Sequence, residues 1–182
     1  MLDIEIILQE DIGLPASFQK KCGPTCIQMV INYFGQSFEK QDKIIKEIDT
    51  EGIRGRTVGI AGYLSGRGFF ATAVKVSEFK VFEFIEFVEE NNCPAILCHS
   101  SSSVNHGGHH TVLRGFSDKR NLIALKNDPA KNNEVKIKLE ILKELWRDKN
   151  NGQVTGFWAV IVSTDECKVS LLEKLGLIES KI

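Results

Sequence analysis

A cysteine stands at the start of a helical-looking run in the stretch KKCGPTCIQMVINYFG, residues 20–35. Pro24 suits the first turn of a helix, where its missing N–H would have no partner. Cys22 is therefore expected at the helix N-terminus, where unpaired N–H groups and the helix dipole favour the thiolate. The two lysines directly before it would add positive charge. The pattern predicts a nucleophilic Cys22, whereas Cys26, one turn later, is expected to pack in the core.

Two adjacent histidines offer a base for this thiol, in the β-like segment VNHGGHHTVLRGF. Side chains alternate along a strand, so only one of His109 and His110 is expected to point at Cys22. The base needs a third group to orient it. Asp128, in LKNDPAKN at the end of the next expected strand, is placed to supply that group. Cysteine before a buried helix, then histidine and acid on successive strands, is the chain order of papain-like sites.

The elements around these residues indicate an α+β fold. Helices are expected over 22–35 and 38–49 and in TVGIAGYLSGRGF and VFEFIEFVEENN, with a strand at residues 3–8 and another in ATAVKV. Short β-rich segments follow, near 95–99, 109–116, 121–127 and 155–163, with helices in KLEILKELWRDKN and SLLEKLGL. Helices first and antiparallel strands second predict helices segregated from one sheet. The nucleophile helix is expected to be buried against that sheet.

Length and composition set broad limits. The 182 residues are expected to form a single domain over 1–182, and the net charge of −1 gives no electrostatic reason to expect nucleic acid as a partner. No apolar run reaches the roughly 18 to 20 residues that span a bilayer. MLDIEIILQED lacks the features of a signal peptide, and five cysteines without framework spacing indicate reduced thiols. We therefore expect a cytoplasmic monomer, with leaderless secretion as an effector left open.

Three segments together resemble the papain-like cysteine peptidases that process double-glycine leaders in bacteriocin-exporting ABC transporters, and their stand-alone, C39-like relatives. LPASFQKKCGPTCIQMVINYFG is similar to the family's Leu-Pro, Gln and Cys-Gly-Pro segment, which opens a helix ending in Tyr-x-Gly. GHHTVLRGF is similar to its Gly-His-strand-Gly motif, and NDPA to its Asn-Asp-Pro. The resemblance covers roughly residues 14–160. It implies a papain-like fold with the N-terminal helical part packed on a C-terminal antiparallel sheet.

The resemblance also assigns the catalytic residues. Cys22 matches the nucleophile and Asp128 the acid that orients the imidazole. The family places a glycine six residues after its histidine, and counting back from Gly115 gives His109, with His110 as the alternative.

The oxyanion-hole glutamine of the family normally precedes the cysteine by five or six residues. Gln19 matches the LPxxxQ context but lies only three residues before Cys22, so the loop is shorter here. Gln9, after the first expected strand, is the other candidate.

The implied function is hydrolysis of a peptide or isopeptide bond through a Cys-His-Asp triad and a thioester acyl-enzyme, with no cofactor. An acyltransferase or deamidase with the same triad, and a catalytically silent peptide-binding relative, remain alternatives. A zinc site is the competing use of Cys98 and the histidines, but no CxxC or HxxxH pair occurs, so no metal is expected. His99 and His106 are expected in surface or loop positions.

Overall fold

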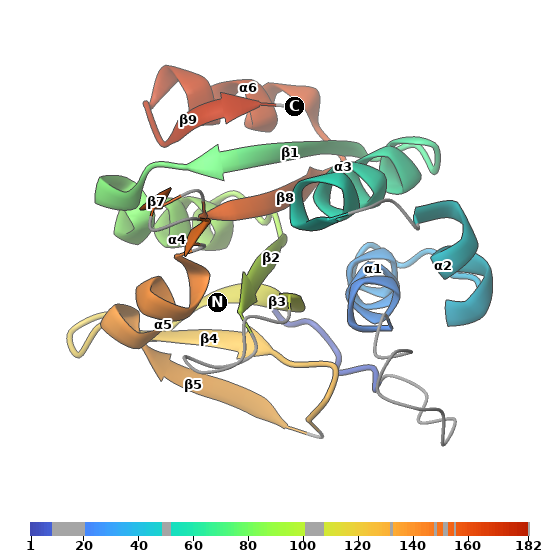
Figure 1. The fold of residues 1–182 in the computed structure, drawn as a ribbon, viewed down its shortest axis with the longest axis horizontal. Coiled ribbons are helices and arrows are strands. Elements are labelled where there is room, and N and C mark those ends of the chain that lie inside the picture. The colour runs from blue at the N-terminus through green and yellow to red at the C-terminus, as the bar shows by residue number, and fades with distance from the viewer. Residues whose placement is uncertain are drawn as a thin grey trace.

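The computed structural model of the chain (Figure 1) describes residues 1–8, 21–48, 52–100, 108–131, 133–147, 149–150, 153–154 and 156–181. Its helices are α1 (Cys22–Tyr33), α2 (Gln41–Ile48), α3 (Gly52–Ser65), the 3₁₀ turn η2 (Glu78–Lys80), α4 (Val81–Glu90), α5 (Leu139–Trp146) and α6 (Glu166–Lys174). Its strands are β1 (Phe70–Val76), β2 (Ala95–Ser100), β3 (Gly108–Asp118), β4 (Ile123–Asn127), β5 (Glu134–Lys138), β6 (Lys149–Asn150), β7 (Gln153–Val154), β8 (Trp158–Ser163) and β9 (Ile178–Lys181).

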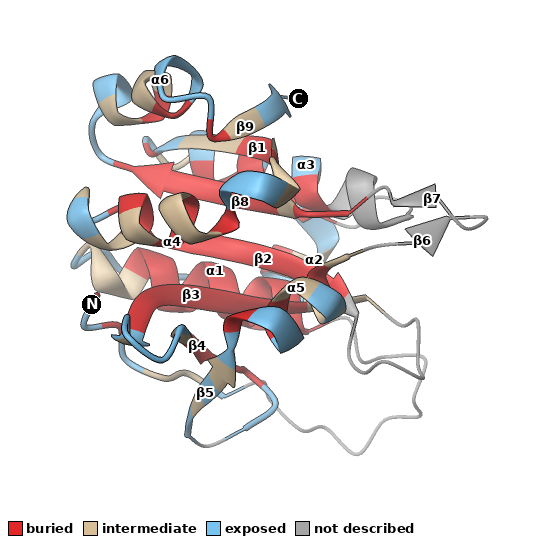
Figure 2. Ribbon diagram, turned by 90° about the vertical axis from the view of Figure 1, so that its left-hand side faces the viewer, coloured by how far each residue is buried: buried red, intermediate tan, exposed pale blue. Residues whose placement is uncertain are grey.

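Seven strands form one sheet in the order β5-β4-β3-β2-β8-β1-β9, and every neighbouring pair is antiparallel. Helices α1, α2 and α3 lie along one side of this sheet, and α4 and α5 lie on the other (Figure 1, Figure 2). β6 and β7 make a separate two-stranded ribbon. The arrangement confirms the expected α+β fold, in which a buried N-terminal helix packs on an antiparallel sheet.

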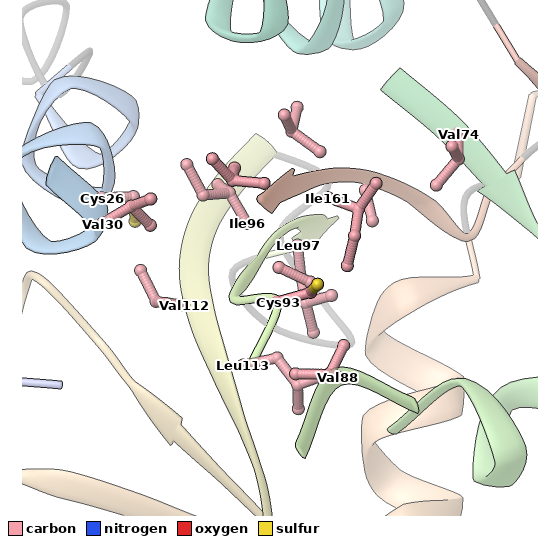
Figure 3. Packing of buried hydrophobic residues seen from close by; sticks show 14 of the residues in the cluster. Cys26, Val30, Val74, Val88, Cys93, Ile96, Leu97, Val112, Leu113 and Ile161 are labelled. Carbon is pink, nitrogen blue, oxygen red and sulfur yellow. The ribbon is translucent and has the colours of Figure 1, made fainter. Parts of the chain in front are cut away.

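The core runs through both sides of the sheet, because the central strands are buried on each face (Figure 2). On one face, Cys26 and Val30 of α1 pack toward Val112 of β3 (Figure 3). On the other face, Leu113 of β3 points toward Val88 of α4 (Figure 3). Alternate residues of one strand therefore belong to different helical environments, as the two-residue period of a strand requires.

The sheet is larger than the sequence predicted. The strand β1 was expected within the helical part of the sequence and outside the predicted sheet. In the structure it lies between β8 and β9 in the main sheet. β5 and β9 were not expected, although the alternating burial of EVKIK in β5 is a usual signature of a sheet-edge strand. Segregation of helices from strands in sequence is therefore less complete than predicted.

The N-terminal strand predicted for residues 3–8 is absent, because the segment makes too few ladder bonds. The N–H of Leu2 donates to the Arg114 carbonyl at 2.8 Å, and the Arg114 guanidinium donates to the Leu2 carbonyl. Further on, the Asn127 side-chain amide donates to the Ile4 carbonyl at 2.8 Å. Side chains of β3 and β4 thus take over hydrogen bonds that a neighbouring strand would have made.

Candidate active site

Helix α1 begins at Cys22, as the sequence predicted, and places the thiol against the start of β3. All residues of Cys22–Ile31 are buried, since the helix is apolar on most sides. The helix ends where Gly35 adopts a left-handed φ of +72° and donates its N–H to the Asn32 carbonyl at 2.9 Å. The Cys22 residue is 4% exposed, so its thiol lies within the boundary between helix and sheet.

His109 and Asp128 meet where β3 begins and β4 ends. β4 ends at Asn127, and the backbone N–H of Ala130 then donates to Asp128 Oδ1 at 3.0 Å. The same Oδ1 lies 2.8 Å from His109 Nε2. Since Nε2 faces the carboxylate, Nδ1 is the ring nitrogen on the opposite side that remains for a thiol. The fold thus brings together the two residues that the sequence assigned to base and orienting acid.

His110 lies nearer to the nucleophile than the sequence predicted. Its Nδ1 is 3.5 Å from Cys22 Sγ, and its Nε2 is buried with no hydrogen-bond partner in the described part of the chain. His109 also interacts with Cys22, so the expectation that only one histidine could face the thiol is wrong. β4 pairs with β3 only from Val112 onward, so no residue of β4 flanks the two histidines.

The two histidines change the acidity of the thiol. Burial alone would raise the pKa of Cys22, but hydrogen bonds from His109 and His110 and their charges hold it well below its ordinary value. The reciprocal effect is seen on His109: burial alone would lower its pKa, whereas its bonds to Asp128 and Cys22 raise it to about 9. These shifts favour an ion pair between thiolate and imidazolium, the reactive form of a cysteine nucleophile.

Two other charged groups complete the electrostatics. Burial alone would raise the pKa of Asp128, but the hydrogen bond and charge of His109 lower it to about 2. Lys21, expected to support the thiolate, places its ammonium 3.1 Å from Asp42, and the charges that lower the pKa of Cys22 are those of the histidines. Cys26 shows the contrast, since burial raises the pKa of this core thiol well above its ordinary value.

A buried polar cluster beside His109 was not predicted. His99 lies on β2 directly opposite His109, is 4% exposed rather than on the surface, and stands edge-on to the His109 ring at 5.5 Å. Its Nε2 lies 3.0 Å from Thr111 Oγ1 and 3.1 Å from Lys126 Nζ. Burial lowers the pKa of Lys126 to about 8. This cluster depends on the register of β2 on β3, which pairs residues 98–99 with 109–110 and which no sequence motif indicated.

Several predicted residues lie outside the described ranges. They are the two oxyanion-hole candidates Gln19 and Gln9, the upstream Lys20, and His106. Among the described residues, no group of three or more His, Cys, Asp and Glu side chains is arranged to hold a metal ion.

Comparison with known proteins places this geometry in a family. The model of the Peptidase C39-like family matches residues 1–154. The chain belongs to the Peptidase C39-like family. No curated protein matches it. Within the described residues, none of the helices has the length and apolar character needed to cross a membrane.

Two solved structures share the fold of this C39-like protein. One is a double glycine motif protease from an AMS/PCAT transporter in complex with its leader peptide, with a TM-score of 0.58 and 19% identity over 90% of this chain and 94% of that one. The other is the peptidase domain of Streptococcus ComA, a bifunctional ABC transporter in a quorum-sensing pathway. It has a TM-score of 0.63 and 16% identity over 90% of this chain and 100% of that one. The chain therefore has the fold of these two peptidase domains.

Proposed function

We propose that this protein is a cysteine peptidase in which Cys22 attacks the substrate carbonyl, His109 transfers the protons and Asp128 orients His109. The observation that carries the proposal is the line of contacts from a thiol of lowered pKa, through His109, to Asp128 Oδ1 at 2.8 Å. A structural cysteine has no need of a base with an orienting acid behind it. Gln19, with Gln9 as the alternative, is the proposed donor to the oxyanion.

Acylation would begin from the ion pair. The thiolate of Cys22 forms a bond to the carbonyl carbon, and the carbonyl π electrons move onto oxygen to give the oxyanion. As the C–N bond breaks, His109 gives its Nδ1 proton to the departing amine. The result is a thioester on Cys22, a free amine product and a neutral His109, still held through Nε2 by Asp128.

Deacylation would use the same histidine in the opposite sense. Neutral His109 takes a proton from water as the oxygen attacks the thioester carbonyl, and Cys22 leaves as thiolate. The product is the carboxylic acid, and the ion pair of Cys22 and protonated His109 is restored. An acceptor amine in place of water would give acyl transfer, so the fate of the thioester separates hydrolase from transferase.

The relatives suggest the first substrates to test. The AMS/PCAT relative is a double glycine motif protease solved with its leader peptide. We therefore propose peptides with two glycines before the scissile bond as the first substrate class for this chain. Two glycines before the scissile bond present a backbone without side chains on that side of the bond. Such a narrow backbone can approach a reacting thiol that is only 4% exposed.

The proposal is tested by incubating the protein with a pool of peptides containing internal Gly-Gly and identifying the products by mass spectrometry. Intact-mass measurement during turnover should show an acyl adduct on wild-type protein and none on Cys22→Ala. Cys26→Ala, which removes a buried thiol one turn away, is the matched control and should keep both cleavage and adduct. Binding of peptides without cleavage or adduct would favour the silent, peptide-binding alternative.

A further inference from the structure

The single-histidine mechanism leaves His110 unexplained. This residue lies opposite Cys98 in the β2–β3 register, and its Nδ1 is 3.5 Å from Cys22 Sγ. The chain of α1 passes directly over it, because a Cβ built on Gly23 would lie 3.7 Å from the same Nδ1. His110 is therefore enclosed by α1 and β2 at the point where the thiol sits.

The surroundings of His110 contain sulfur atoms rather than a carboxylate partner. Among the described residues, the titratable groups that act on it are Cys98 from β2 and Cys22 from α1. Burial alone would lower the pKa of His110, but these two sulfurs raise it. A buried imidazolium with one N–H unpaired is costly in free energy, and its contacts to sulfur must offset that cost. The contacts available for this are those to Cys22 and Cys98, and the bond to Cys22 is strongest between imidazolium and thiolate.

We propose that His110 is a second imidazole acting on the nucleophile: it stays protonated through the catalytic cycle and holds Cys22 as a thiolate, while His109 carries the protons. The inference deepens the proposed peptidase function and rests on it for the catalytic cycle. Thiolate stabilisation and proton transfer, which one histidine performs in the single-histidine mechanism, are then divided between two.

The proton balance of this arrangement closes. In the resting site, Nδ1–H of His110 donates to the Cys22 thiolate, and His109 is protonated and paired with Asp128. During acylation the leaving amine takes its proton from His109, and during deacylation water returns a proton to His109. His110 keeps its own proton throughout, so its charge still favours departure of the thiolate when the thioester breaks.

Burial explains why the roles divide in this way. His110 is 3% exposed, whereas the side chain of His109 is 15% exposed. A group that exchanges protons with substrate and water must reach them, and a group that only supplies charge need not. When the thioester breaks, Cys22 leaves as a thiolate while His109 is only gaining its proton from water, so a thiolate stabilised by His109 alone would depend on the timing of that transfer. A permanent charge on His110 removes that dependence.

The decisive experiment measures the thiolate directly, without substrate. Absorbance of the thiolate near 240 nm is titrated against pH in Cys167→Ser protein, which lacks the exposed thiol, with Cys22→Ala as the blank. His110→Phe and His110→Gln should each raise the thiolate pKa by about one unit or more, since both remove a charge in contact with sulfur. His109→Ala should keep a thiolate at pH 7 although its turnover is lost.

The acid limb of the kcat/KM profile should move with the thiolate. In both His110 variants it should shift to higher pH by the same amount as the thiolate pKa, while the activity at the optimum falls less than in His109→Ala. A thiolate pKa unchanged in both His110 variants, or a thiolate lost at pH 7 in His109→Ala alone, would overturn the inference. A wild-type protein that cleaves no peptide but shows the expected thiolate shifts would instead overturn the peptidase function.

A second measurement covers the case in which the His110 variants do not fold. Ring nitrogen shifts from NMR on ¹⁵N-histidine-labelled protein report the charge of His110 against pH. Because coupling between two titrating groups is reciprocal, Cys22→Ser should lower the pKa of His110 by about as much as His110→Phe would raise that of the thiol. A neutral His110 ring in wild-type protein at pH 7 would contradict the proposal.

Discussion

The two faces of the sheet at the start of β3 carry the same residue type in opposite surroundings. On the α1 face, His110 lies among the sulfurs of Cys22 and Cys98, and its Nε2 has no hydrogen-bond partner among the described residues. On the other face, His109 is bonded to Asp128 and stands edge-on to His99. One position along a strand thus separates an imidazole whose neighbours are sulfur atoms from one held by a charge-assisted bond to a carboxylate.

Under the proposed function, proximity to Cys22 does not by itself identify the base. A general base needs a fixed tautomer, and only His109 has a carboxylate that fixes it through Nε2. Nδ1 of His110 lies 3.5 Å from Cys22 Sγ, but its Nε2 has no hydrogen-bond partner in the described part of the chain that would fix a tautomer. Variants of residues on each face distinguish the roles of His109 and His110, and they are given from the largest expected effect to the smallest.

Removal of the Cys22 thiol should abolish catalysis, whichever histidine acts on it. Cys22→Ala leaves neither histidine a nucleophile to act on, so turnover should fall by at least about 10⁴-fold. The paired variant Cys26→Ala should keep turnover and lose about 1 kcal/mol of unfolding free energy, because it removes a buried sulfur from the core. Steady-state kinetics and urea unfolding check the two effects. A Cys26→Ala protein as inactive as Cys22→Ala would show that the nucleophile is misassigned.

Loss of His109 should cost more activity than loss of any other group on its face. His109→Ala removes the proton carrier, which should reduce kcat by about 10²- to 10⁴-fold. Alkylation of Cys22 by iodoacetamide at pH 7 should continue, since the charge of His110 remains. Rates of cleavage and alkylation, measured on one preparation, check both expectations. A His109→Ala protein with near wild-type kcat would move the catalytic role to His110.

The sequence was informative wherever a feature depended on local pattern. Helix α1, its start at Cys22 and its end before Gly35 follow from Pro24, apolar residues on most sides and a glycine that accepts positive φ. The contact between His109 and Asp128 agrees with counting back from Gly115. That glycine is required, because its φ is +123° and a Cβ there would lie 2.8 Å from the Glu89 carboxylate.

Features that depend on strand pairing were beyond the sequence. The place of β1 between β8 and β9, and the burial of His99 against Lys126, follow from register, which local periodicity does not encode. Strand alternation correctly put His109 and His110 on opposite faces. It did not indicate that both imidazoles would nevertheless act on Cys22.

The ion pair of His109 and Asp128 should make the protein's stability depend on pH in two directions. The pKa of Asp128 is lowered to about 2, so its contribution is present above the ordinary value near 3.8 and is lost as the pH falls toward 2. The pKa of His109 is raised to about 9, so its contribution is full below its ordinary value near 6.5 and is lost as the pH rises through 9. The wild-type advantage over Asp128→Asn should therefore peak between about pH 4 and 6.5.

That advantage should amount to roughly 2 kcal/mol, because the pKa of a largely buried carboxyl is lowered from 3.8 to about 2. Urea unfolding of both proteins at a series of pH values measures it. Asp128→Asn should also slow turnover while leaving alkylation of Cys22 closer to wild type than His109→Ala does. A constant stability difference from pH 3 to pH 9 would show that Asp128 acts through packing and not through charge.

The smallest effect is expected from Lys126→Met. It tests whether the buried polar cluster beside His109 affects the chemistry of His109 or only packs against it. Burial lowers the pKa of Lys126 to about 8 from an ordinary 10.5, so between these values the unfolded chain binds more protons than the folded one. Stability of the wild-type protein should therefore rise from pH 8 to pH 10 through this group, and Lys126→Met should lose that rise. Because Lys126 also lowers the pKa of Asp128, the variant should shift the activity profile by only a few tenths of a pH unit. Unfolding curves at pH 7 and pH 10 and a kcat/KM profile of Lys126→Met measure both effects. An activity loss as large as that of Asp128→Asn would mean that Lys126 and His99 set the position of the His109 ring. The buried polar cluster would then be needed for catalysis.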